Sequence, residues 1–413
     1  MRLSLLPLLP ALALLAACSN STTEEQTAKT ETMADTANKV AGVAPKADTA
    51  TAPATKPAAQ PTALAPDTAN VQNVAAYLAG LEPKTGTPLA TLATQPAWQA
   101  FAKDQDKSWD KYRTTHTDPM NKWAATELDS VRQATTTLFY PFSGPDFLNA
   151  FTLFPTASTY VMFGLEPVGS VPSRANLKNP AILPAVKRSL WSVLNFSFFR
   201  TNDMAVDLKS VNLDGAVPLI MLFAARTGNH LLSVRPVQLD AQGQLHEAAD
   251  SAAGSQAIPG AELKLQAADG TEKTIYYFSA DLSDYKLATK DAPLKYVRTL
   301  GPLTTYVKSA TYLMHKSYFS KVRNLVLERS NYLLQDDSGI AMKYFPKSAW
   351  QFTYYGTYRR PINLFAKQYQ PELTSAYHDT LRRARPLPFG TGYNWRQTDS
   401  NLLLAKRRAP IAE

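Results

Sequence analysis

The stretch that most constrains the fold spans residues 136–169, TTLFYPFSGPDFLNAFTLFPTASTYVMFGLEPVG. Its apolar run 138–142 ends at Ser143-Gly144-Pro145, which predicts a buried strand that turns into a helix with Pro near its first position. Apolar residues then recur at helical spacing up to residue 154, and Pro155 ends the pattern. Residues 160–163 predict a second strand. This strand, helix and strand should lie centrally in an α/β sheet.

Residues 1–17 predict a lipoprotein signal peptide. Arg2 precedes an apolar run, 3–15, that is too short to span a bilayer as a mature helix and ends in small residues. Leu15-Ala16-Ala17-Cys18 resembles the bacterial lipobox, which implies that Cys18 is diacylated, as by palmitate, and anchors the chain in an envelope membrane. We expect the outer membrane, with the domain in the periplasm or at the cell surface. The alternative is an unmodified cysteine beside an ordinary cleavage site.

The chain after the signal peptide divides by composition into a linker and one domain. Residues 18–70 are rich in Thr, Ala, Pro and Lys, with scarcely an aromatic, so they predict a lipidated, disordered tether. Residues 71–413 have globular composition and no internal linker. We therefore expect a single α/β domain: a mixed twisted sheet flanked by helices, with β-hairpins and with peripheral helices over 71–135.

Cysteine and charge exclude some functions and favour others. Cys18 is the only cysteine, which excludes an internal disulfide, a thiolate nucleophile and a cysteine zinc site in the mature chain. The whole chain has a net charge of +9. Residues 285–413 hold 21 Lys and Arg against 8 Asp and Glu, a net charge of +13, so the remainder of the chain is net acidic. A basic third in the envelope favours an anionic lipid, lipopolysaccharide or polysaccharide as partner, and no nucleic acid. A solvated basic surface is the alternative.

Further elements follow from periodicity and turn residues. Helices are predicted over 71–81, 179–200 and 216–227, and the longest over 302–329. Asp269-Gly270 predicts a hairpin between 263–265 and 274–278. Asp336-Asp337-Ser338-Gly339 predicts another hairpin, with Asp337 in an exposed turn.

The carboxyl ends of the two central strands supply the catalytic candidates Ser143, Asp146 and Glu166. Strand-to-helix loops at that edge expose backbone donors, so a hydroxyl and two carboxylates could face one cleft. The competing interpretation is structural: Ser143 caps the helix, Asp146 complements its dipole, and Glu166 makes a surface turn with Pro167.

The same 34 residues, 136–169, are similar to the opening of methyltransferase-like Rossmann folds. In that family, the acidic residue after the second strand binds the cofactor ribose, which implies this role for Glu166. Ser143-Gly144-Pro145-Asp146 departs from the family's richer glycine loop. The resemblance therefore implies a fold class and no activity, and we expect no cofactor.

The remaining candidates are the ligand-binding residues Asp336, Arg359, Arg360 and Tyr393. Arginine with tyrosine suits phosphate, carboxylate or sugar recognition, and further clusters occur at Arg382-Arg383, at Arg385 and over 406–408. Arginine stems that pack a tyrosine-rich surface are the alternative. The five histidines lack metal-ligand spacing, so no metal site is expected. Two functions remain: an envelope protein that binds an anionic component, which we prefer, and an envelope hydrolase or transferase.

Overall fold

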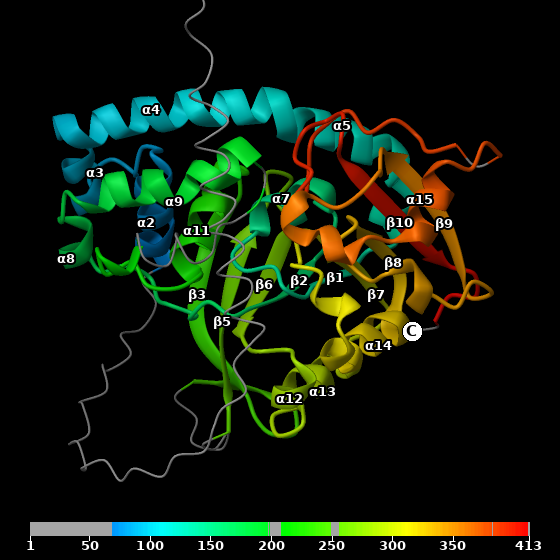
Figure 1. The fold of residues 1–413 in the computed structure, drawn as a ribbon. Helices are drawn as coiled ribbons and strands as arrows, with labels where there is room; N and C mark the ends of the chain where they lie inside the picture. The colour runs from blue at the N-terminus through cyan, green and yellow to red at the C-terminus, as the bar shows by residue number, and fades with distance from the viewer. Residues whose placement is uncertain (1–67, 197, 199–207, 249–255, 382, 412–413) are drawn as a thin grey trace, which may run out of the picture. The chain divides into compact units, whose positions relative to one another are not determined.

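The described residues build one mixed sheet of ten strands in the order β4-β3-β5-β6-β2-β1-β7-β8-β10-β9 (Figure 1). The structure is a computed structural model that describes residues 68–196, 198, 208–248, 256–381 and 383–411. The predicted signal peptide, Cys18 and nearly all of the tether lie outside these residues. The strands are β1 Thr137–Tyr140, β2 Thr159–Gly164, β3 His230–Leu239, β4 Leu245–Glu247, β5 Ile258–Gln266, β6 Glu272–Ser279, β7 Leu303–Val307, β8 Ser330–Gln335, β9 Trp350–Gly356 and β10 Asn401–Arg407.

Helices surround this sheet. The α-helices are α2 Thr68–Ala79, α3 Pro88–Ala93, α4 Pro96–Tyr112, α5 Asp118–Glu127, α6 Asp129–Ala134, α7 Phe147–Leu153, α8 Arg174–Leu177, α9 Ile182–Phe196, α11 Val217–Arg226, α12 Asp284–Leu287, α13 Ala292–Thr299, α14 Ser320–Arg329 and α15 Pro371–Tyr377. Shorter turns of helix are the π-helical η1 Arg113–Thr117 and the 3-10 helices η3 Leu313–His315, η4 Ser317–Phe319, η5 Met342–Tyr344 and η6 Asn363–Gln368.

The five strands β6, β2, β1, β7 and β8 run parallel and form the middle of the sheet. Antiparallel strands extend both ends, with β5, β3 and β4 beyond β6, and β10 and β9 beyond β8. This arrangement confirms the predicted fold class of a mixed α/β sheet flanked by helices. It also confirms the hairpin at Asp269-Gly270, which joins β5 to β6.

Alternating residues divide the core between the two faces of the sheet. On β1, Leu138 and Tyr140 belong to a large apolar cluster under α2, α4, α5, α7, α9 and α11, whereas Phe139 belongs to a second cluster under α13 and α14. Figure 1 shows these two groups of helices on opposite sides of the strands. The central strands are apolar on both faces because both faces are covered.

The central unit forms as predicted, and its helix is fixed at both ends. Asp146 is the N-cap of α7, since its carboxylate accepts the backbone N–H of Asn149, and the helix ends at Leu153. β1 and β2 lie side by side in parallel register. Within α7, Phe147 is fully buried, whereas Phe151 is partly buried.

The predicted helix over 302–329 is wrong. Residues 303–307 form strand β7, residues 308–312 form a loop, and only Ser320–Arg329 form the long helix α14. The β-branched and aromatic run Thr304-Thr305-Tyr306-Val307 suits a strand, and Ser309, Thr311 and Tyr312 have positive φ, which a helix does not allow. Apolar residues at intervals of three and four happened to continue across the break.

The predicted hairpin at 336–339 is also wrong. β8 pairs with β7 and β10, and the residues after the turn form the 3-10 helix η5 instead of a returning strand. Asp337, expected in an exposed turn, is 3% exposed. The turn is buried because it lies at the carboxyl end of a central parallel strand, where other loops cover it.

Truncation of one buried side chain in α7 should show where the core lies. Phe147 is fully buried, with its ring centroid 5.1 Å from that of Tyr160, so Phe147→Ala should lower the free energy of unfolding by about 3–5 kcal/mol. Leu381, which is 92% exposed, is the control, and Leu381→Ala should change it by less than about 0.5 kcal/mol. Urea unfolding measures both. Equal effects of the two variants would contradict this assignment of the core.

Candidate functional site

Four loops meet at the carboxyl edge of the parallel strands. They are residues 141–146 after β1, 165–166 after β2, 308–312 after β7 and 336–339 after β8. The order reverses at the centre, because β2 lies on one side of β1 and β7 on the other. In open α/β sheets, ligands bind in the crevice at such a switch point. We call the residues of these four loops, with Tyr393, the strand-end network.

A buried ion pair joins the two loops at the switch point. Lys308 Nζ lies 2.8 Å from Asp146 Oδ2, and the two side chains are 2% and 1% exposed. The hydroxyl of Tyr140 donates to the same Asp146 oxygen at 3.0 Å. The other carboxylate oxygen accepts the backbone and side-chain amides of Asn149. Both oxygens of Asp146 are therefore engaged. The structural interpretation named Ser143 as the helix cap, and this was wrong: Asp146 caps α7, whereas the Ser143 hydroxyl donates to two backbone carbonyls.

The loop after β7 binds two further candidates through its backbone. The Ser309 N–H donates to Asp336 Oδ2 at 2.8 Å, and the hydroxyl of Tyr393 donates to the Ser309 carbonyl at 2.8 Å. Ser309, Thr311 and Tyr312 have φ values of 51°, 51° and 52°. Residues with side chains rarely adopt this left-handed conformation, so the surrounding contacts hold the loop in a strained shape.

The two adjacent aspartates are both buried and have separate partners. Asp336 accepts the backbone N–H and the hydroxyl of Ser338, in addition to Ser309. Asp337 accepts the hydroxyl of Tyr312 and, at 3.1 Å, the amide of Asn401. Burial, with the negative charge of Asp336 beside it, raises the pKa of Asp337 to about 7. Each carboxylate thus ties the turn after β8 to a neighbouring segment.

Ser143 and Glu166 lie at this edge without forming a catalytic pair. The Ser143 hydroxyl donates to the carbonyls of Gly144 and Phe163, at 2.9 and 3.1 Å. Glu166 accepts the hydroxyl of Tyr277 at 3.2 Å, and burial raises its pKa. Within the described residues, no hydrogen bond joins the Ser143 hydroxyl to a carboxylate. A serine nucleophile needs such a base, so this geometry leaves Ser143 unactivated.

The structure brings Asp146, Asp336 and Tyr393 together around one loop and leaves the predicted arginines elsewhere. Arg359 and Arg360 are exposed and follow β9. Asp146, Asp336 and Tyr393 are 1%, 2% and 8% exposed, so solvent and ligands reach little of them. Lys308 and Ser309, which connect the three, were missed because the sequence predicted a helix there.

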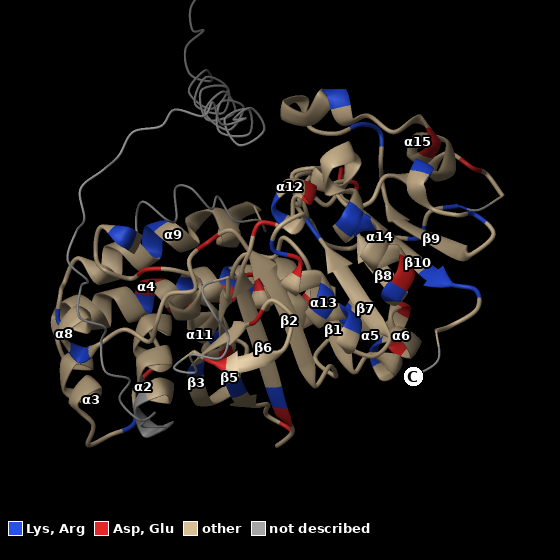
Figure 2. Ribbon diagram, turned by 90° about the horizontal axis from the view of Figure 1, so that it is seen from below, with Lys and Arg blue, Asp and Glu red and all other residues tan. Residues whose placement is uncertain are grey.

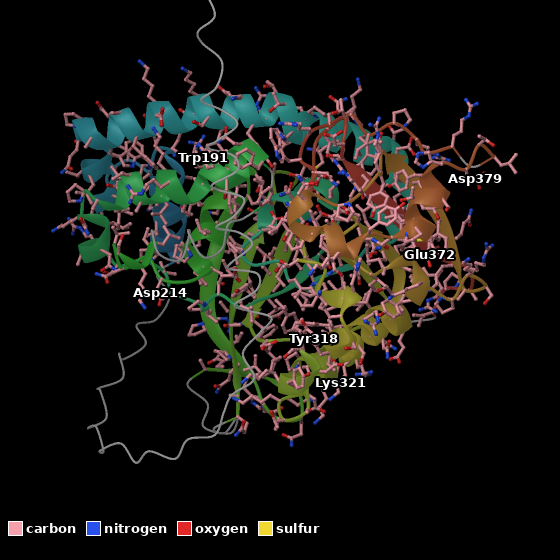
Figure 3. The ribbon with its side chains drawn as sticks, in the orientation of Figure 1. Trp191, Asp214, Tyr318, Lys321, Glu372 and Asp379 are labelled. Atoms are coloured by element: carbon pink, nitrogen blue, oxygen red, sulfur yellow. The ribbon has the colours of Figure 1, made fainter. Side chains whose placement is uncertain are left out.

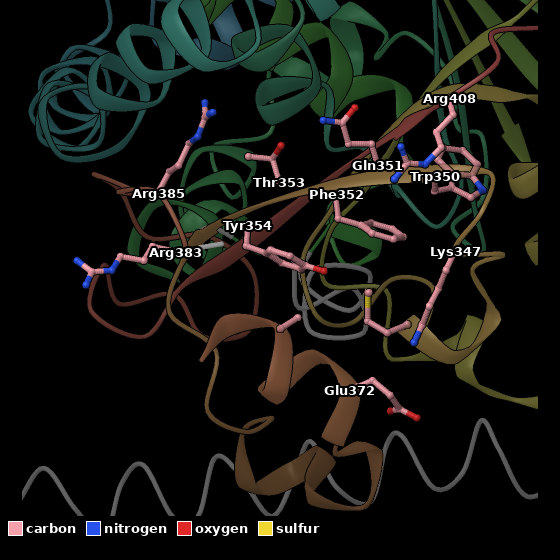
Figure 4. Close-up of a pocket in the computed structure, with 12 residues that line it drawn as sticks. Lys347, Trp350, Gln351, Phe352, Thr353, Tyr354, Glu372, Arg383, Arg385 and Arg408 are labelled. Atoms are coloured by element: carbon pink, nitrogen blue, oxygen red, sulfur yellow. The ribbon is translucent and has the colours of Figure 1, made fainter. Parts of the chain in front are cut away.

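A groove of about 650 Å³ lies elsewhere, along β9 (Figure 4). Strand residues 350–354 form one side of it, and Met342 of η5 and Ala376 of α15 contribute to the other. None of the strand-end candidates lines it. Its charged lining residues are Lys347, Arg383, Arg385, Arg408 and Glu372. We call this the β9 groove.

The β9 groove draws on all three of the further basic clusters noted in the sequence. Arg383 and Arg385 precede the last part of the chain, and Arg408 directly follows β10. Figure 2 shows Lys and Arg at the end of β10 and in the segment beside β9. Lys347 was missed, because a lone lysine between two apolar segments carries no signal of its own.

Comparisons with protein-family models, with curated proteins and with solved structures find no match to this chain. The described residues contain no cluster of three or more His, Cys, Asp or Glu side chains that could hold a metal ion. None of the described helices combines the length and apolar character needed to cross a bilayer.

Removal of the buried lysine should be costly. Lys308→Met leaves the Asp146 carboxylate buried without its cation, so the free energy of unfolding should fall by about 3–5 kcal/mol. Adding Asp146→Asn removes the unpaired charge and keeps an acceptor for the helix cap, so the double variant should regain much of the loss. Chemical denaturation measures all three chains. A double variant less stable than Lys308→Met would contradict the ion pair's role.

The raised pKa of Asp337 should make stability fall as pH rises. The folded protein binds the proton of the Asp337 carboxyl group more tightly than the unfolded chain does. Stability is therefore lost as the pH rises from the usual aspartate pKa near 4 to the folded-state pKa of about 7. His116 and His315, whose pKa values burial lowers to about 4, act in the opposite direction.

The test therefore compares the protein with Asp337→Asn, which still accepts a hydrogen bond from Tyr312. The stability of the unaltered protein relative to the variant should decline from pH 4 to pH 7 and then stay level, in urea titrations at each pH. If the free energies of unfolding of the protein and of Asp337→Asn change with pH in parallel, Asp337 does not titrate in this range.

Proposed function

We propose that this chain is a lipid-anchored envelope protein whose domain binds an anionic envelope component in the β9 groove. Recognition without turnover is the proposed activity. The lipobox-like sequence at Cys18 supports the anchor. The observation that carries the binding proposal is the charge of the β9 groove, where four basic side chains meet one acidic one.

Three of those cations are available to a ligand. Arg385 pairs with Glu127 at 2.7 Å, whereas Lys347, Arg383 and Arg408 are exposed and have no ion pair with a described residue. A cation that has no internal partner gives up little when it binds an anion. The volume also fits, since small-ligand pockets measure about 300–1,000 Å³.

The acidic side chains near the groove do not close it. Glu372 lies on α15 and lines the groove, whereas Asp379 follows that helix, lies at the right edge of Figure 3 and does not line it. Figure 4 shows the Glu372 carboxylate on the side of Lys347, apart from Arg383 and Arg385. The positive field of the groove therefore remains open to an incoming anion.

An envelope hydrolase or transferase at the strand-end network is the second candidate. In chain order, the parallel strands are arranged 3-2-1-4-5, as in doubly wound nucleotide-binding sheets, and Glu166 follows the second of them. These features favour the similarity to methyltransferase-like Rossmann folds. The buried and fully paired state of Asp146 speaks against turnover there. If the candidate is right, Ser143 should react with a fluorophosphonate probe and Ser143→Ala should not; we expect no labelling of either.

The anchor has its own test. Cys18→Ala should release the protein from the membrane fraction while the domain stays folded, because a lipid chain supplies the attachment and the tether contributes no core. Fractionation after a high-salt wash, followed by immunoblotting, measures the distribution. A variant that stays with the membrane would assign the anchor to an unprocessed signal peptide or to the domain.

Charge reversal in the groove should weaken binding. The test protein is residues 18–413 with Cys18→Ala, called the unlipidated chain, mixed with lipopolysaccharide or with phosphatidylglycerol vesicles in a salt series. Replacing Lys347, Arg383 and Arg408 by Glu should weaken binding at least about tenfold. Binding should also weaken with salt, because ions screen exposed charges.

The control is Lys103→Glu with Lys107→Glu, two exposed lysines on α4, which should bind normally. A separate variant, Arg359→Ala with Arg360→Ala, measures any share of the predicted arginine pair. Equal losses in the groove and control variants would reduce the binding to net charge and contradict the groove.

A further inference from the structure

Strand β9 ends the sheet, and β10 is its only strand partner among the described residues. The odd-numbered residues on and beside it face β10. The Arg408 N–H donates to the Ala349 carbonyl at 2.9 Å, and the Thr357 N–H donates to the Ser400 carbonyl at 2.8 Å. Successive residues of a strand direct their backbone groups to opposite sides. The even-numbered residues therefore direct theirs away from the sheet.

A short parallel contact confirms this direction at one end of β9. The Arg385 N–H donates to the Tyr354 carbonyl, and the Gly356 N–H donates to the Arg385 carbonyl, both at 2.8 Å. The contact is an isolated bridge and does not continue along the strand. No described residue pairs with the outward N–H and C=O of Phe352. An unpaired stretch of sheet edge remains beside it.

The β9 groove follows this unpaired edge. Residues 350–354 all line the groove, so it runs along the strand past the outward backbone of Phe352. The facing side chains include Met342 of η5 and Ala376 of α15, which are small or apolar. The groove thus offers a strand edge on one side and, on the other, two apolar side chains with Lys347 and Glu372 beside them.

Basic side chains stand at both ends of the groove. Figure 4 shows Arg383 and Arg385 toward one end of β9, and Lys347 and Arg408 toward the other. Between them the strand residues 350–354 carry no charge, and Glu372 of α15 is the one acidic residue in the lining. A ligand that lies along the edge would therefore meet positive charge at each end and an uncharged strand in the middle.

We infer that the β9 groove binds an extended, acidic segment of a partner polypeptide, which adds to the sheet edge as a further strand. The inference rests on the proposed function, because it names the class of anion that the groove takes. An extended polypeptide supplies alternating N–H and C=O groups at the spacing of the open edge, and its side chains point alternately into the groove and away. Carboxylates toward its two ends would meet the basic residues.

Other occupants fit the groove less well. A lipid headgroup would neutralise the cations but leave the backbone of Phe352 without a matching row of partners. A second copy of this chain would bring Lys347, Arg383 and Arg408 against their own counterparts, and like charges at a shared edge repel. Lysine and arginine beside an edge strand also discourage self-association. An acidic strand avoids both difficulties.

The test uses the unlipidated chain and a fluorescent peptide, Glu-Asp-Thr-Val-Thr-Val-Asp-Glu, followed by anisotropy. An analogue with the same charges is N-methylated at its four central residues, which removes the backbone donors on both edges. The analogue should bind at least about tenfold more weakly, the loss expected for one or two backbone hydrogen bonds. A peptide with Lys in place of the acids should not bind.

A matched pair of variants tests the protein side. Phe352→Pro removes the outward N–H without breaking a bond to β10, and proline is tolerated at sheet edges. Phe352→Ala removes the ring and keeps the N–H. The dissociation constant for the acidic peptide should be at least about tenfold higher for Phe352→Pro than for Phe352→Ala. Circular dichroism confirms folding, and the N-methylated peptide gives the same answer with an unaltered protein.

The outcomes separate this inference from the proposed function. Equal binding of the acidic peptide and its N-methylated analogue would overturn strand addition. Binding of lipopolysaccharide or anionic vesicles at the groove, without the peptide, would also overturn it and leave the proposed function standing. If neither the acidic peptide, nor lipopolysaccharide, nor anionic vesicles bind, both this inference and the proposed function are overturned.

Discussion

The ion pair between Lys308 and Asp146 connects the two halves of the parallel sheet. Asp146 follows β1 and Lys308 follows β7, so the contact crosses the point where the strand order reverses. Neither charge can leave its partner without remaining uncompensated in the interior, which makes the contact expensive to break. Asp146 also caps α7, so one carboxylate fixes a sheet junction and a covering helix together. Strand pairing sets β7 beside β1, and the ion pair holds together the two loops that follow these strands at the carboxyl edge.

The same pairing explains why the expected ligand site is filled. With Lys308 turned toward Asp146, the next residue takes a left-handed conformation and its backbone binds Asp336 and Tyr393. Residues that suit catalysis by type are thereby used to hold loops in place. By contrast, the basic residues without an ion pair to a described residue and the unpaired backbone of Phe352 lie along β9, the outermost strand of the sheet. In this protein, the edge of the sheet is the chemically open surface, and the switch point is closed by the chain's own side chains.

The fold class followed from the sequence because its strongest signals were local. Residues 136–169 contain two apolar strands, a helix and a helix stop, and Asp269-Gly270 marks a hairpin; each of these forms as predicted. The failures were non-local. Thr304-Thr305-Tyr306-Val307 has strand composition, but the spacing of later apolar residues matched a helix, and only pairing with β1 and β8 decides the matter. Asp337 is buried by segments distant in sequence, such as Asn401, so no local pattern could show its environment. The basic clusters were visible, but not the strand edge that gathers Arg383 and Arg408 around one groove.

The position of β10 makes the assembly of the sheet sequential. This strand, the last in the chain, lies between β8 and β9, so β9 has no neighbour in the sheet until residues 401–407 arrive. The parallel strands can associate earlier, since they and their covering helices precede it in the chain. Contacts that join distant segments form slowly, because a long loop must close first. A chain clipped before residue 401 would therefore lose β10, with the core contacts of Leu402 and Leu404, and leave β9 without a partner in the sheet. Proteolysis at that point would thus erase the β9 surface.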